Sequence, residues 1–134
     1  EKGEYVWDGR FNMGVVSLNL PQIGLLSGKN EEKYFEILDK RLDLCRRALM
    51  LRYDLLKDVT SDVSPIHWQY GAIARLGKGE KVGKLMQNGY ATISLGYIGI
   101  YEASILVTGK SHTSPEGQKF AMKLLRRLKD AVAK

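Results

Sequence analysis

Two short apolar runs stand out against longer amphipathic stretches along the chain. Gly14–Leu20 and Ala91–Tyr97 are almost continuously apolar, which is typical of strands buried on both faces of a parallel sheet. Pro21 ends the first run. A strand buried in this way needs a neighbour on each side. We therefore expect two buried strands whose sheet is completed from elsewhere, by a second copy or by the rest of a larger protein.

A long helix is predicted between the two strands, from Glu31 to about Lys57. Asn30 is a suitable N-cap, and Glu31 and Glu32 place negative charge in the first turn, where the helix dipole favours it. Cys45 falls on the apolar side of this helix, so we expect a buried packing residue rather than a reactive thiol. That side repeats at steps of three and four and consists of Phe35, Leu38, Leu42, Cys45, Leu49, Tyr53 and Leu56.

Two shorter helices are predicted between the long helix and the second strand. Ser64 followed by Pro65 can open one of them, because proline is well tolerated at the first helical position. A weaker helix is expected over Glu80–Gln87, and Asn88 and Gly89 form a suitable C-terminal signal for it.

Two further helices are predicted after the second strand. The first covers Ile98–Thr108 and follows the strand with little intervening loop. The second begins with Ser114 as cap, Pro115 at the first position and Glu116 in the first turn. Its core face is expected to consist of Phe120, Leu124, Leu128 and Val132. The order of strands and helices places the chain in the α/β class.

The first residues of the chain resemble half of a hairpin. Tyr5–Arg10 has strand character, and Asp8 with Gly9 is a turn signal, but the other half of the hairpin and an initiating methionine do not precede it. We therefore expect the chain to be a piece of a larger protein.

Composition narrows the classes of protein. The chain has 134 residues, of which 44% are hydrophobic and 27% charged, as in ordinary globular domains. It lacks an apolar run of about eighteen residues and an N-terminal signal layout, and it has one cysteine, which together favour a reducing cytoplasm over a membrane or secretion.

The net charge of +6 says little about binding partners. Gln118–Lys134 is the most basic segment, but aromatic residues do not interleave there, so a solvated helix face is favoured over a nucleic-acid surface. Attraction for phosphorylated small molecules stays open.

Familiar catalytic patterns are not matched. Gly77–Lys81 lacks the spacing of a phosphate-binding loop and is expected to be a turn. His67 and His112 have no cysteine or carboxylate at ligand spacing, which argues against a metal site. A triad of Ser94, His67 and Asp62 is rejected, because no serine lies in a nucleophile elbow.

Three strings are too particular to be ordinary surface. They are DGRFNMGVVSLNLP at residues 8–21, SPIHWQYGA at 64–72 and GYATISLGYIGIYE at 89–102. Together they closely resemble the large subunit of the anaerobic (class III) ribonucleoside-triphosphate reductases. The resemblance extends over essentially the whole chain, with the motifs in the family's order.

The resemblance implies a glycyl-radical oxidoreductase built on a ten-stranded α/β barrel, of which residues 1–134 would be one fragment. In such enzymes a glycyl radical generates a cysteine thiyl radical, which abstracts the ribose 3′-hydrogen, and formate supplies electrons. The implied cofactors also include a structural zinc and allosteric ATP or dATP. The implied partners are a ribonucleoside triphosphate substrate, a radical-SAM activase and a second subunit in a homodimer, with no membrane and no nucleic acid.

The chain departs from the family at the radical chemistry itself. The finger-loop cysteine would precede Glu1, and the glycyl-radical loop and the zinc-binding cysteines would follow Lys134; the nucleotide-binding cone is absent too. Cys45 matches none of these sites. We therefore expect no cofactor in this piece of chain and no activity from it alone.

Three residues are candidates to face the substrate. Asn12 is the position matched to the family's active-site asparagine, where an amide can hydrogen-bond a ribose hydroxyl. Asn19 ends the first strand and competes with it, although either amide could instead bond local backbone. Glu102 follows the second strand, at the end of a sheet where α/β proteins bind ligands, but a solvated first-turn acid is the favoured interpretation. His67 and Trp68 are expected to pack in the barrel wall.

A rival interpretation from another class stays open. It is a non-catalytic α/β module that dimerises to complete its sheet and holds phosphorylated ligands on its basic last helix. A related glycyl-radical lyase is a weaker alternative.

Overall fold

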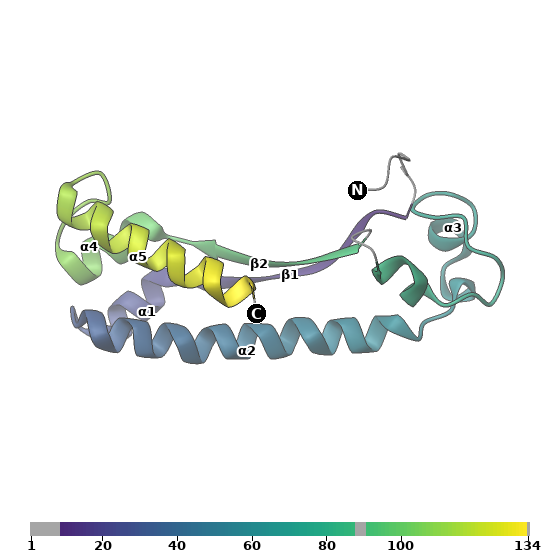
Figure 1. Ribbon diagram of the computed structural model, residues 1–134, viewed down its shortest axis with the longest axis horizontal. Coiled ribbons are helices and arrows are strands. Elements are labelled where there is room, and N and C mark those ends of the chain that lie inside the picture. Colours follow the sequence, from purple (N-terminus) through teal and green to yellow (C-terminus); the bar gives the residue numbers. More distant parts are fainter. Residues whose placement is uncertain (1–8, 88–90, 134) are drawn as a thin grey trace. The chain divides into compact units, whose positions relative to one another are not determined.

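The computed structural model describes residues 9–87 and 91–133. Two strands and the helices that follow them make up a mixed α/β structure, which confirms the predicted class. Strands β1 and β2 pair with each other and run in the same direction (Figure 1). In chain order the elements are β1 (Phe11–Asn19), α1 (Leu20–Ser27), α2 (Glu31–Lys57), η1 (Ser61–Val63), α3 (Pro65–Trp68), η2 (Val82–Met86), β2 (Ala91–Ile98), α4 (Ile100–Thr108) and α5 (Pro115–Val132).

The residues group into two compact units. The first unit takes the chain before Val16 and the stretch Ala48–Ser94, and the second takes Val16–Arg47 and the stretch from Leu95 onwards. β1, α2 and β2 each contribute to both units.

The second unit holds the main apolar core. Tyr34 of α2 and Phe120 of α5 meet edge to face with ring centroids 5.2 Å apart, a favourable aromatic geometry. α1 packs closely on α4, and α4 on α5. Buried residues of this core come from β1 and every helix of the unit: Leu18, Leu20, Ile23, Tyr34, Leu38, Leu42, Cys45, Ala103, Val107, Phe120, Leu124 and Leu128.

The first unit is held by a smaller set of contacts. Ser61 is buried, and its hydroxyl donates to the carbonyl of Gly77 at 2.7 Å. Phe11 of β1 meets Trp68 of α3 edge to face, with the ring centroids 5.1 Å apart. Gly83 approaches the end of α2 so closely that a Cβ there would lie 2.4 Å from the carbonyl oxygen of Lys57. Glycine is therefore required at that approach.

The predicted long helix is confirmed at both ends. α2 covers Glu31–Lys57, and the Asn30 side chain accepts a hydrogen bond from the Lys33 amide at 2.9 Å, as an N-cap should. The predicted apolar face is buried or half-buried along its length, Cys45 included. The cap of α5 is also confirmed, since Ser114 Oγ accepts from the Gly117 amide at 3.2 Å.

Several boundaries differ from the predictions. Leu20 belongs to α1, a helix that the sequence reading missed, and not to the first strand. The weaker helix expected over Glu80–Gln87 is the 3-10 helix η2. The helix expected from Ile98 begins at Ile100, because Gly99 adopts a left-handed conformation at its N-cap. Val132 is 66% exposed and does not extend the core face of α5.

The described residues alone do not bury the two strands on both faces, and cover from a second copy or from further chain stays a prediction. Within β1 only Leu18 is buried, Val15 is 52% exposed, and no residue of β2 is fully buried. The faces of a strand are covered by elements that pack on the sheet, and in the part of the chain that the structure describes this cover reaches Leu18 but leaves Val15 exposed. The predicted half-hairpin over Tyr5–Arg10 falls mostly outside the described residues, and the helix-ending signal at Asn88 and Gly89 falls wholly outside them.

Candidate functional site

Asn12 lies near the start of β1 in the first unit, with its side chain exposed. Its Nδ2 donates to the hydroxyl oxygen of Ser94 on β2 at 2.6 Å, and its Oδ1 accepts from the Gly14 amide at 2.8 Å. Both ends of the amide are thus held by neighbours, one on each strand. An amide fixed in this way can present its remaining N–H and lone pair to a hydroxyl group.

Gly14 shapes this part of β1. Its φ is +146°, and the position a Cβ would take lies 1.6 Å from a guanidinium nitrogen of Arg52 on α2. The Arg52 side chain therefore occupies the place of a side chain at residue 14, and any larger residue would displace it.

Asn19 ends β1 and caps α1 in the second unit. Its Oδ1 accepts from the Gln22 amide at 3.1 Å, and Pro21 stands in the first turn of the helix. One oxygen lone pair and the Nδ2 group stay available, because Asn19 is exposed. Asn19 thus bonds local backbone, the alternative given for both asparagines, as the cap of a helix that was not predicted; a role toward substrate stays a prediction.

Glu102 lies exposed in the first turn of α4, just after β2. Gly99 precedes this helix with a φ of +81°, and a Cβ on it would lie 2.3 Å from Cγ of Pro21. The chain following β1 and the chain following β2 therefore touch at the carboxyl ends of the two strands. Asn19 and Glu102 share this end in the second unit, and Asn12 belongs to the first unit.

Cys45 and the histidines have structural surroundings. Cys45 is a free thiol buried in the core of the second unit, and burial raises the pKa of this thiol, as suits a packing residue. His67 is exposed and bonds Ser64 Oγ at 2.7 Å, whereas Trp68 is half-buried against Phe11; packing of the two in a barrel wall stays a prediction. Over residues 9–87 and 91–133, no group of three or more metal-ligating side chains gathers.

The basic face of α5 is partly neutralised within the second unit. Arg127 forms a bidentate pair with Asp39 of α2, and Lys123 bonds Glu31 at 2.5 Å while lying 4.5 Å from the centre of the Phe35 ring. These pairs join α5 to α2. They leave fewer free cations for a phosphorylated ligand, so the geometry does not favour the rival binding module.

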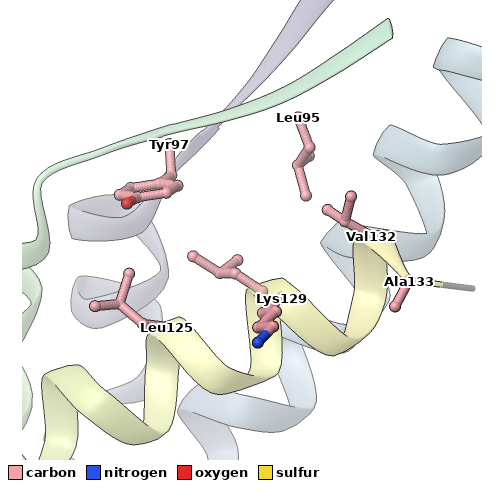
Figure 2. A pocket seen from close by; sticks show the side chains of 7 residues that line it. Leu95, Tyr97, Leu125, Lys129, Val132 and Ala133 are labelled. Carbon is pink, nitrogen blue, oxygen red and sulfur yellow. The ribbon is translucent and has the colours of Figure 1, made fainter. Parts of the chain in front are cut away.

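An apolar pocket of about 520 Å³ opens between β2 and α5 in the second unit. Leu95 and Tyr97 project from the strand toward Leu125 and Val132 on the helix (Figure 2). Its lining is almost entirely apolar, and Lys129 is its one charged member. The predicted site residues are not among those that line it.

Ser94 is a partner of Asn12 that the sequence did not predict. It entered the sequence analysis only in a triad with His67 and Asp62, which was rejected, and the structure pairs it with Asn12. The two residues are 82 positions apart, so no local spacing could reveal the contact. The available signal was that they lie in two of the three unusual strings.

In the described chain no helix is long and apolar enough to span a membrane.

Comparison with known proteins gives a consistent result. The model of a family described as anaerobic ribonucleoside-triphosphate reductase matches residues 1–134. Among curated proteins, enzymes of that name from Haemophilus influenzae and Escherichia coli are 44% and 42% identical over 135 residues, 98% of this chain and 19% of each relative. The one from Enterobacteria phage T4 is 47% identical over 110 residues, 78% of this chain and 18% of the relative. The chain spans about a fifth of the length of these relatives.

Proposed function

The chain belongs to the anaerobic ribonucleoside-triphosphate reductase family, and we propose that it forms part of an enzyme that reduces ribonucleotides to deoxyribonucleotides. The observation that carries the proposal is 42–47% identity to enzymes of that name, which extends over 98% of the chain in the bacterial relatives. Identity at this level over both strands and the intervening helices supports a shared chemistry as well as a shared fold.

In this proposal, β1 and β2 are two neighbouring strands of a ten-stranded α/β barrel, and residues 1–134 belong to its catalytic domain. The parallel pairing and the helices that follow each strand support the placement. The exposure of Val15 on β1 also supports it, because an apolar residue 52% exposed in the middle of a strand is suited to cover by further chain.

The radical and metal chemistry is assigned to other parts of the protein. The family's chemistry calls for a cysteine that carries a radical and for cysteines that bind zinc, but Cys45 is buried on the core side of α2 and fits neither role. The glycyl radical, formate, zinc and the allosteric nucleotides all belong to the proposal for the whole enzyme.

Asn12 is proposed to hold a ribose hydroxyl of the substrate. Its amide is uncharged, exposed and fixed by Ser94 and Gly14, so it can bind a hydroxyl without changing protonation. Asn19 and Glu102 are proposed as further substrate contacts, because both are exposed at the carboxyl ends of parallel strands, where α/β proteins place ligands.

The proposal extends to the setting of the enzyme. It acts in the cytoplasm as a homodimer, on ribonucleoside triphosphates, after activation by a radical-SAM activase. The free, buried thiol of Cys45 is consistent with a reducing compartment.

The test is anaerobic turnover of the full-length protein with activase, formate and a ribonucleoside triphosphate, measured as deoxyribonucleotide formed. The wild-type protein should form product, and Asn12→Ala should lower kcat/KM about tenfold or more, because a hydrogen-bonding group facing substrate is lost. Asn30→Ala is the matched control, since it removes an equal amide that only caps α2. Absence of product from the activated wild-type protein would refute the proposed function.

A further inference from the structure

The amide of Asn12 can adopt one orientation only. The Gly14 backbone N–H is a donor and cannot accept, so the group that faces it at 2.8 Å must be the amide oxygen. The amide nitrogen then faces Ser94, 2.6 Å from the hydroxyl oxygen. The Gly14 N–H therefore determines which end of the Asn12 amide is the oxygen and which is the nitrogen. The Ser94 hydroxyl determines the rotation of the amide plane.

Ser94 is an acceptor in this contact, and this has a consequence for its own proton. A hydroxyl oxygen that accepts from an amide N–H still carries one hydrogen, which must point away from the amide. In the described parts of the chain no acceptor receives that hydrogen. The pair therefore offers an amide N–H, an amide oxygen lone pair and a serine O–H beside one another.

The contact also joins two of the unusual strings that are distant in the sequence. Asn12 comes from the string at residues 8–21 and Ser94 from the string at residues 89–102. Both side chains belong to the first unit and come from the paired strands β1 and β2. A single short hydrogen bond between them fixes the side chain that the proposed function places against substrate.

We propose that Ser94 is a positioning residue for Asn12, holding its amide in the orientation that binds a ribose hydroxyl. The inference rests on the proposed function of Asn12. Without the Ser94 hydroxyl, the amide keeps its bond to Gly14 but is free to rotate about it, so the fraction of molecules with the amide correctly placed falls. The fold itself is little affected, because the Asn12–Ser94 contact is exposed.

The experiment is a double-mutant cycle in the full-length, activated reductase, using Asn12→Ala, Ser94→Ala and the double variant. Ser94→Ala should lower kcat/KM about three- to tenfold, as expected for one lost hydrogen bond. In the Asn12→Ala background the same change should cost less than about twofold, because there is no amide left to position. Ser94→Thr keeps a hydroxyl and suits a strand, so it should recover most of the activity.

Thr92→Ala is the matched control, because it removes an exposed hydroxyl from the same strand, two residues earlier. It should leave kcat/KM unchanged. Equal kinetics for Ser94→Ala and Thr92→Ala, beside an impaired Asn12→Ala, would overturn the inference while leaving the proposed function standing. Losses that multiply in the double variant would overturn it too. If Ser94→Ala lowers the melting temperature, Ser94→Thr decides: recovered turnover supports positioning, and persistent loss contradicts it. Failure of wild-type turnover would instead count against the proposed function.

Discussion

Gly99 is the residue at which the two strand ends meet, and its replacement by alanine should be strongly destabilising. It lies between β2 and α4 with φ +81° and ψ 39°, in the left-handed region. A Cβ at this position would lie 2.3 Å and 2.4 Å from Cγ and Cδ of Pro21. Those atoms belong to a ring in the first turn of α1, so they cannot rotate aside as the end of a flexible side chain would.

The magnitude follows from two separate costs. Placing an alanine in the left-handed region costs about 1–2 kcal/mol. Carbon atoms pack at about 3.5–4.0 Å, so relieving the contact with Pro21 needs a shift of more than about 1 Å between α1 and the start of α4, an overpacking cost of about 1–3 kcal/mol. Gly99→Ala should therefore destabilise the junction by about 2–5 kcal/mol.

Gly109 separates these two costs. It caps the other end of α4 with φ +71°, and a Cβ there would have no atom within 4 Å. Gly109→Ala should therefore lower stability by the conformational cost alone, about 1–2 kcal/mol. Hydrogen exchange of α1 and α4 amides, followed by mass spectrometry, measures the difference. Gly99→Ala should speed exchange about five- to 150-fold more than Gly109→Ala, because the steric cost of about 1–3 kcal/mol separates them and about 1.4 kcal/mol corresponds to tenfold. Equal exchange in the two variants would refute the steric argument.

Four other predictions concern stability and ionisation. Tyr34→Phe should raise the free energy of unfolding by about 1 kcal/mol, because the buried Tyr34 hydroxyl has no hydrogen-bond partner within residues 9–87 and 91–133. Urea unfolding should then show a higher midpoint, and a lower midpoint would contradict this. Asn19→Ala should loosen α1 by about 1 kcal/mol, seen as faster amide exchange, and Asn19→Asp should not, because aspartate also caps. Cys45 should resist iodoacetamide at pH 8 until urea unfolds the protein, since burial raises the pKa of its thiol; rapid labelling of the folded protein would show an open site. The hydrogen bond from Lys81 holds the pKa of Asp58 below its ordinary value, so this pair stabilises the fold at neutral pH and the effect is lost as pH falls through the folded pKa. Carboxyl carbon NMR should show that pKa rising in Lys81→Ala.

Local signals made α2 predictable to the residue, whereas the same kind of signal was missed for α1. The Asn30 cap, the first-turn acids and the apolar face all lie within one continuous segment. α1 has only eight residues, and its cap, Asn19, was interpreted as the end of a strand. Apolar residues dominate α1, so its pattern could not be distinguished from a continuation of the strand.

The burial of the strands could not be predicted from the apolar runs, for a physical reason. An apolar run states which side chains require cover, but it does not state which part of a protein supplies that cover. Leu18 of β1 finds helices to pack against, and Val15 on the same strand does not within the described chain. The prediction that both strands exist is confirmed, and their burial by a second copy or by further chain stays a prediction.

The two asparagines that the sequence left in competition have different hydrogen-bond partners. Asn19 has a local task, since its oxygen satisfies an amide at the start of α1 that would otherwise lack a partner. Asn12 has no such helix to cap; it is tied instead to Gly14 and to Ser94, which lies on the neighbouring strand. A bond between side chains of two strands contributes about 0.2–1 kcal/mol to the sheet, and it also fixes the direction of the amide. An exposed amide whose direction is fixed suits contact with another molecule, which is why we propose Asn12 ahead of Asn19 for the substrate contact.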